Sequence, residues 1–285
     1  MPLIKNAHVL RINAQESIET IDFVAIEAPL EISLHYPSTS GTQVDEQLMI
    51  TMQTPGHESD LAIGYLFGEG LISSASDITA IELNSKESGS DSLEISLDKA
   101  PTRSRQSRQR GIYMNSGCGL CGKDDLSGIH FPKPPDFEAM QPLLKQSVLS
   151  LLSERLHQGQ NGFRSTGGLH AAALFTPEGD LIELREDIGR HNALDKLIGA
   201  ILKKDPTRFE ESILFLSSRL SFELIQKSLT AGIAIVAGVG APSSLAVELS
   251  NRYRQTLIGF VRDDRFNIYS HPQRVNITHP CISSR

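Results

Sequence analysis

Tryptophan is absent from the 285-residue chain, and only three cysteines occur in it. Three thiols are too few for the disulfide framework of a small secreted domain, so a close pair of them would indicate metal or redox chemistry instead. Long apolar runs are also missing: the longest, near 231–241, is far short of the roughly 20 residues that a membrane-spanning helix needs. The first residues lack the pattern of a signal peptide. We therefore expect a cytoplasmic protein that does not associate with membranes.

An excess of basic residues is not present either. The net charge is −7, so we expect no global attraction to nucleic acid or to anionic lipid. Hydrophobic residues make up 39% and charged residues 21% of the chain, which is the balance of a folded globular protein. The length allows one large domain or two ordinary ones.

A proline-rich stretch at 131–137 separates two different sequence patterns. Before it the chain is rich in alternating and β-branched residues, which are typical of strands. The pattern predicts strands at Ile21–Leu34 and Gln47–Met52, a helix at Asp60–Leu71 and a hairpin at Ile78–Leu97. We therefore place a smaller, strand-rich α+β domain at residues 1–130, ending in a cysteine-containing loop.

Beyond the prolines, short apolar strands alternate with amphipathic helices. Strands are expected at 169–175, 181–184, 213–217, 233–238 and 256–261, the first two as a hairpin. Helices are expected at Pro142–Leu156, His191–Leu202, Ser221–Ala231 (with Ser221 as N-cap) and Pro242–Tyr253. Fully apolar strands separated by helices favour a parallel sheet. The predicted fold class is therefore α/β, with a second, α/β domain at residues 137–285.

The sharpest motif is Cys118-Gly-Leu-Cys121-Gly. Two thiols at this spacing can meet one sulfur atom, one metal ion or each other, and the glycines allow the loop to expose them. The thiolate is the nucleophilic form of cysteine, and this setting commonly favours it. A structural zinc site is the alternative, but it needs four ligands, and the chain has no second such pair. Cys281 stands alone near the C-terminus.

Polar residues gather where strands are expected to meet helices. In open α/β sheets ligands bind at the carboxyl ends of strands, and helix N-termini offer free N–H groups to phosphate. Any one of these turns could be purely structural, but together they suit anion recognition. The candidates for binding a cofactor at these junctions are Thr166, Gly167, Gly168, His170, Arg190, His191, Ser218, Arg219 and Ser243.

One of these junctions nearly matches a dinucleotide fingerprint. Gly238-x-Gly240-x-x-Ser243 is followed by Asp263 at about the expected distance, but the third glycine is missing. The motif indicates nucleotide binding in general more than a nicotinamide cofactor. A nucleotide-dependent oxidoreductase is therefore an alternative function.

Six segments follow one another along the chain: CGLCG, FRSTGGLHAAALF, REDIGRHNALDKLIG, SSRLSFELIQKS, APSSLAVEL and TLIGFVRDDRFNIYSHPQR. Taken in this order, they resemble the FdhD family of formate dehydrogenase accessory sulfurtransferases. The resemblance runs from about Leu30 to Arg274 and is strongest from Cys118 onward.

This resemblance implies a function. Family members take sulfur from a cysteine desulfurase as a cysteine persulfide. They pass it to a bis-molybdopterin guanine dinucleotide cofactor of molybdenum or tungsten, bound as cargo, before that cofactor enters formate dehydrogenase. The resemblance also implies a homodimer, no permanently bound metal, and a C-terminal domain of the cytidine deaminase type without its zinc signature. A non-catalytic chaperone for the cofactor is the other alternative.

The resemblance also assigns residues. Cys118 matches the persulfide carrier, and Cys121 matches the second cysteine of the pair. Arg262 and Arg265 are expected to contact phosphate. They belong to the segment that matches the family's cofactor contact, Phe260, Val261, Arg262, Asp263, Asp264 and Arg265.

Overall fold

The computed structural model of the chain describes residues 3–38, 40–85, 91–101, 137, 144–263 and 265–278. Cys118, Cys121, Asp264 and Cys281 lie outside the described residues, and so does the proline-rich boundary apart from Phe137. The predictions that depend on these positions stay predictions.

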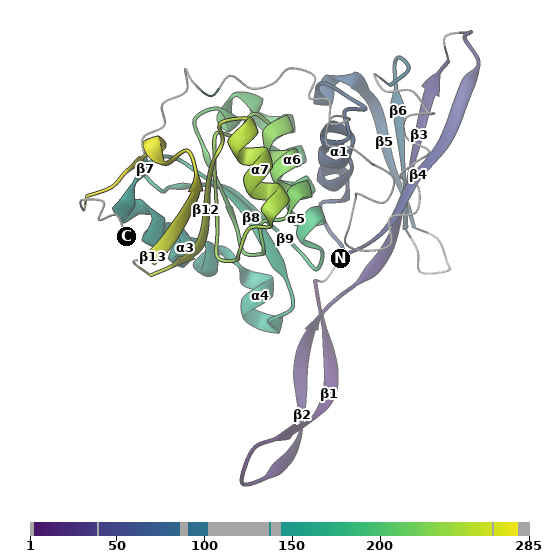
Figure 1. The fold of residues 1–285 in the computed structure, drawn as a ribbon. Helices are drawn as coiled ribbons and strands as arrows, with labels where there is room; N and C mark the ends of the chain where they lie inside the picture. The colour runs from purple at the N-terminus through teal and green to yellow at the C-terminus, as the bar shows by residue number, and fades with distance from the viewer. Residues whose placement is uncertain are drawn as a thin grey trace.

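The chain begins with a long β-hairpin that projects from the rest of the molecule (Figure 1). Strand β1 (Ile4–Ile12) pairs antiparallel with β2 (Ser17–Ala25) along its whole length. The prediction of one strand at Ile21–Leu34 was wrong, because the chain leaves this hairpin after Ala25 and enters another sheet at β3 (Ala28–Pro37). The backbone N–H of Ile26 donates to Leu3 O, which closes the base of the hairpin at the break.

The first half of the chain also forms a four-stranded sheet in the order β4-β3-β6-β5. Strand β3 buries Leu30, Ile32 and Leu34 completely, and the residues between them face outward with the period of two of a half-buried strand. The predicted hairpin at Ile78–Leu97 is confirmed, with β5 and β6 antiparallel. The bounds of the other strands are Gln43–Gln53 for β4, Ile78–Ser85 for β5 and Asp91–Leu97 for β6.

A six-stranded sheet forms the second half, in the order β13-β12-β11-β10-β8-β9. The predicted parallel pairing is confirmed for strands β10, β11 and β12. Strands β8, β9 and β13 are instead antiparallel to their neighbours. Short turns join β8 to β9 and β12 to β13, and such turns connect only antiparallel strands. The bounds are His170–Phe175 for β8, Leu181–Asp187 for β9, Ile213–Leu216 for β10, Ile235–Gly238 for β11, Thr256–Arg262 for β12 and Arg265–Ser270 for β13.

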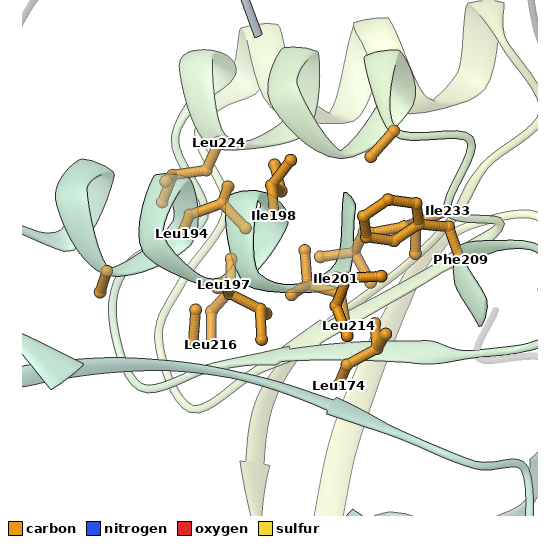
Figure 2. Packing of buried hydrophobic residues seen from close by; sticks show 14 of the residues in the cluster. Leu174, Leu194, Leu197, Ile198, Ile201, Phe209, Leu214, Leu216, Leu224 and Ile233 are labelled. Atoms are coloured by element: carbon orange, nitrogen blue, oxygen red, sulfur yellow. The ribbon is translucent and has the colours of Figure 1, made fainter. Parts of the chain in front are cut away.

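Helices cover this sheet (Figure 1). Figure 2 shows Leu194, Leu197 and Ile201 of α5 lying over Leu214 and Leu216 of the sheet. Each such buried side chain contributes roughly 1.5–3 kcal/mol. Among the described helices, none is both long and apolar enough to cross a lipid bilayer. The helices are α3 (Gln146–Gly159), α4 (Asn161–Thr166), α5 (Arg190–Lys204), α6 (Phe222–Thr230) and α7 (Ser244–Arg252).

The start of α3 differs from the predicted Pro142. Leu144 and Lys145 form a short strand, β7, which pairs with β14 (Val275–Asn276) near the end of the chain. The chain can therefore become helical only from Gln146. Three short 3₁₀ turns complete the described elements, at Ala75–Asp77, Pro206–Phe209 and Pro272–Arg274.

Helix α1 (Glu58–Gly68) lies between the two sheets and crosses α5 at very short range. A Cβ atom on Gly64 would lie 2.6 Å from the carbonyl carbon of Asp195, and closer still to its oxygen. A Cβ atom on Gly199 would lie 2.7 Å from the carbonyl carbon of Asp60. Each helix thus places a glycine against the backbone of the other, and this reciprocal contact sets how closely the halves pack.

A buried ionic network also joins the halves. Lys196, with 1% of its surface exposed, places Nζ 2.6 Å from Oδ2 of the fully buried Asp187. The same ammonium group donates to Gln53 Oε1 at 3.0 Å and to Thr54 O at 2.6 Å. Asp187 accepts further hydrogen bonds from the backbone N–H groups of Thr54 and Gly189. The end of β4 is therefore attached to the turn that precedes α5.

We expect Lys196→Met to destabilise the protein by about 3–5 kcal/mol, because it leaves the Asp187 carboxylate buried without its countercharge. Urea denaturation, with the midpoint and the slope fitted together, measures the change. The double variant Asp187→Asn, Lys196→Met removes both charges and should recover part of the loss. A single variant as stable as the wild type would contradict this account of the network.

Candidate functional site

Three parallel strands end together on one edge of the six-stranded sheet. Strands β10, β11 and β12 run in the same direction, so Leu216, Gly238 and Arg262 mark one edge. Strand β8 runs the opposite way and pairs Ala172 with Leu216, which brings its first residue, His170, to the same edge. Open α/β sheets bind ligands in this position. We call this region, with the loops that follow the three strands, the carboxyl edge.

Helix α5 also begins at the carboxyl edge, since β9 pairs its last residue, Asp187, with His170. The structure therefore brings most of the predicted cofactor-binding residues together, although they come from distant parts of the sequence. These residues are Gly167, Gly168, His170, Arg190, His191, Ser218, Arg219, Ser243 and the segment from Phe260 to Arg265, of which Asp264 lies outside the described residues.

Glycine allows the loops at this edge to lie against one another. A Cβ atom on Gly240 would lie 2.7 Å from Ser218 O and 2.8 Å from the Cα atom of Arg219. Gly240 O also accepts a hydrogen bond of 3.1 Å from the backbone N–H of Phe260. The glycine of the near-dinucleotide motif thus permits close packing of its own loop against the loop after β10 and against strand β12. Ser243 of the same motif accepts a bond from Ala246 N and caps α7.

Basic side chains surround His170. Burial is the main cause that lowers the pKa of His170, and the charges of Arg190, His191 and Arg219 lower it further. These three groups come from the start of α5 and from the loop after β10, and each affects the pKa of His170 more than the Asp187 carboxylate, which raises it. An anion bound at this point would be stabilised by the same charges.

The lowered pKa of His170 predicts how the ring responds to pH and to anions. The ordinary pKa of a histidine is 6.5. As the pH falls, this ring is therefore protonated in the unfolded chain before it is protonated in the folded protein. The stability that comes from neutral His170 is complete above that value and decreases as the pH drops below it.

We expect bound pyrophosphate to raise the pKa of the His170 ring, because its negative charge offsets the positive charges of the arginines. An NMR titration measures this pKa, and the His170 signal is identified by its loss in the His170→Gln variant. A pKa that stays the same in the presence of pyrophosphate would contradict the prediction.

His191 is held by a carboxylate from the next helix. Its Nε2 atom lies 2.7 Å from Oε2 of Glu223, in the first turn of α6. The hydrogen bond from His191 lowers the pKa of the Glu223 carboxyl, against the effect of burial. Ser221 occupies the predicted N-cap position of this helix, but its buried hydroxyl makes no capping hydrogen bond and bonds to no described residue. The negative charge of Glu223 complements the helix dipole instead.

The β12–β13 hairpin presents two arginines. Arg262 and Arg265 are directly paired across the hairpin, so their exposed side chains share one face. Neither forms an ion pair with a residue that the structure describes. Phe260 is 41% exposed and has a φ of 56°, which is uncommon for a bulky side chain and typical of strained functional segments. Val261 differs, since its fully buried side chain belongs to the core and only its backbone could contact a ligand.

The model of the FdhD/NarQ family matches residues 25–276 of the chain. The chain belongs to the FdhD/NarQ family. This confirms the resemblance seen in the sequence motifs.

Two curated members of the FdhD/NarQ family illustrate the similarity. The sulfur carrier protein FdhD of Sulfolobus acidocaldarius is 38% identical over 256 residues, covering 90% of this chain and 92% of the relative. That of Nocardia farcinica is 39% identical over 273 residues, covering 94% and 93%. A crystal structure from Desulfotalea psychrophila, described as a formate dehydrogenase accessory protein, has a TM-score of 0.69 at 23% identity, covering 96% of this chain and 100% of that one. This similarity shows that the two chains share the same fold.

Two residues that order the site of this FdhD/NarQ member were not among the candidates from the sequence. Ser217 accepts a hydrogen bond of 2.8 Å from Ala171 N and fixes β8 against the loop after β10. Glu223 holds His191, and its position in the first turn of a predicted helix could have indicated a role.

The described part of the chain offers no metal site. Among the residues that the structure describes, no three His, Cys, Asp or Glu side chains gather so that they could hold a metal ion. The hypothesis of a zinc site concerns Cys118 and Cys121, which lie outside this part. It is therefore left as an alternative.

Proposed function

We propose that the protein is a sulfurtransferase that carries a persulfide on Cys118. It delivers the sulfur to a bis-molybdopterin guanine dinucleotide cofactor of molybdenum or tungsten before formate dehydrogenase receives that cofactor. The observation that carries the proposal is that His170, at the start of β8, lies at the same end of the sheet as the start of α5 with Arg190 and His191 and the loop after β10 with Arg219. Membership in a family with curated sulfur carriers supports the sulfur chemistry.

The cargo is anionic, and the carboxyl edge offers it several kinds of donor. Guanidinium groups bind phosphate oxygens in pairs, and Arg190, Arg219, Arg262 and Arg265 supply four of them. Helices α5 and α6 begin at this edge without a side-chain cap on their first N–H groups, and such ends favour phosphate. Glu223 keeps His191 in place beside them. This arrangement suits a dinucleotide with two phosphate groups.

Sulfur loading would follow ordinary thiol exchange. The Cys118 thiolate attacks the terminal sulfur of a persulfide on a cysteine desulfurase. A new S–S bond forms on Cys118, the S–S bond of the donor breaks, and the donor cysteine leaves as a thiolate.

Release requires the terminal sulfur to gain two electrons and leave as sulfide for the metal of the cargo. Cys121 can supply them if its thiolate attacks Sγ of Cys118. That step breaks the persulfide bond and forms a Cys118–Cys121 disulfide, which a thiol reductant must reduce before the next turnover. The other role for Cys121 is to maintain the redox state of the loop.

The finer features of the resemblance are part of the same proposal. We infer a C-terminal part of the cytidine deaminase type, a boundary near residues 131–137, a homodimer and a cytoplasmic location. The mixed sheet with helices packed against it supports the first of these.

The test is the intact mass of the protein after incubation with an active cysteine desulfurase and cysteine. We expect a gain of one sulfur atom, which is lost again on treatment with a thiol reductant. Calorimetric binding of GDP, which is one end of the cargo, tests the second half of the proposal. GDP binding without any sulfur gain would instead favour the non-catalytic cofactor chaperone.

A further inference from the structure

The amino-terminal hairpin of β1 and β2 carries a large share of the exposed apolar surface. Among the residues that the structure describes, seven of the fourteen exposed large hydrophobic side chains lie between Leu3 and Val24. The hairpin projects from the rest of the molecule (Figure 1), and the family model matches the chain only from residue 25. The function that the family shares therefore does not explain this surface.

One face of the hairpin is apolar. Residues directly opposite each other on antiparallel strands share a face, and so do alternate residues of one strand. The β1–β2 register thus places four large side chains on one face, which we call the arm face: Leu10, Ile12, Ile21 and Phe23. They are 51–68% exposed, whereas the other face carries an ion pair between Arg11 and Asp22. A two-stranded hairpin is at best marginally stable alone in water, so the arm face needs an apolar surface to pack against.

A second uncovered apolar surface lies on strand β4, at the edge of the four-stranded sheet. Thr51 and Gln53 bond to side chains of α5. Ile50 and Met52 alternate with them and therefore point to the opposite side of the strand. These two side chains, which we call the edge patch, are 61% and 48% exposed. The hairpin points away from this sheet (Figure 1), so the arm face of a chain does not cover its own edge patch.

We propose that two copies of this chain exchange their hairpins, so that the arm face of each packs against the edge patch of the other. A two-fold axis forms both contacts at once, because each copy offers the arm face and the edge patch. The nine residues of each strand span about 30 Å, which is long enough to reach a neighbouring molecule.

The apolar area is close to what such an interface needs. The six side chains of the arm face and the edge patch expose roughly 600 Å² in each copy. A standard stable interface buries about 800 Å² per partner, and the backbone and polar side chains beside these residues add to the contact. The inference rests on the homodimer of the proposed function and adds the surface that forms it.

The experiment is sedimentation analysis of the full chain across the micromolar range, in which we expect the wild type to form a dimer. Ile21→Asp alters the arm face and Ile50→Asp alters the edge patch. Each should raise the Kd of the dimer by about a hundredfold or more, because the contact would bury an unpaired carboxylate. Leu83→Asp is the matched control. Leu83 is 46% exposed on β5, at the opposite edge of the same sheet, and its replacement should leave the Kd unchanged.

A mixture of the two variants tests the exchange itself. In a mixed dimer the intact arm face of the Ile50→Asp chain meets the intact edge patch of the Ile21→Asp chain, which restores one of the two contacts. We therefore expect the mixture to associate more tightly than either variant alone. A monomeric wild type, a dimer that neither variant weakens, or a mixture that gains nothing would each overturn the proposal.

Sulfur loading of the wild type by the desulfurase separates this inference from the proposed function. Loading of a wild type that stays monomeric would overturn the hairpin exchange and leave the carrier role of Cys118 in place. A wild type that dimerises through its hairpins but gains no sulfur would leave the exchange in place and contradict the carrier role.

Discussion

Replacing Gly199 by alanine is expected to destabilise the protein by about 3 kcal/mol or more. The added methyl group would lie 2.7 Å from the carbonyl carbon and 3.0 Å from the Cα atom of Asp60. These are backbone atoms of a helix, so no side-chain rotation can make room. Helices α1 and α5 would have to separate. Gly64→Ala should have a similar effect, because its methyl group would meet the backbone of Asp195 in the same way.

Gly68→Ala in the same helix α1 is the matched control. Its new Cβ would meet only the side chain of Lys227, at 3.3 Å from Nζ, and a side chain can shift. Alanine also favours a helix over glycine by about 1 kcal/mol, which partly offsets any crowding. Urea unfolding of the three variants measures the difference. Equal stability of Gly199→Ala and Gly68→Ala would show that the close crossing of the helices does not limit the fold.

Replacing Cys118 by alanine is expected to abolish sulfur loading completely. The proposed loading step forms its S–S bond on Cys118 Sγ, and no other group of the motif is assigned that role. The fold and GDP binding should be unchanged, because the substitution removes one thiol and leaves the buried core and the basic side chains near His170 in place. Intact mass after incubation with the desulfurase gives the result. Cys281→Ala, which removes a thiol outside the motif, should load sulfur as the wild type does.

Cys121→Ala separates the two roles proposed for the second cysteine. If Cys121 releases the sulfur, the variant should still gain one sulfur atom but fail to release sulfide afterwards. If it only maintains the redox state, the variant should release sulfide normally once a reductant is present. A Cys118→Ala protein that still loads sulfur at full yield would refute the carrier assignment.

The elements with strong local signals were predictable from the sequence. The hairpin of β8 and β9 and helix α5 have clear periodicity and end at turn residues, so local rules suffice for them. The break between β2 and β3 was not predictable in this way. Alternation continues across Ala25 and Ala28, and the break is fixed by the hydrogen bond from Ile26 to Leu3, which directly precedes β1.

The candidate site was predictable as a set of strand ends but not as a set of side chains. A strand in a sheet exposes alternate residues, so a matching segment such as Phe260 to Arg265 does not reveal that Val261 points into the core. The contact of Glu223 with His191 depends on packing between α5 and α6, and only the position of Glu223 in the first turn of a predicted helix pointed to it. The residue types in the sequence do not show which of these side chains lie close together in the folded protein.

The place of helix α1 between the two sheets also has a kinetic consequence. Its Asp60 bonds to Arg185, 125 residues later, and Gln53 just before it bonds to Lys196, 143 residues later. Contacts this far apart slow folding, because a long loop must close before they stabilise anything. During synthesis α1 leaves the ribosome well before α5 exists to cover it. Its apolar surface is then open to aggregation or to chaperones until the second half of the chain emerges.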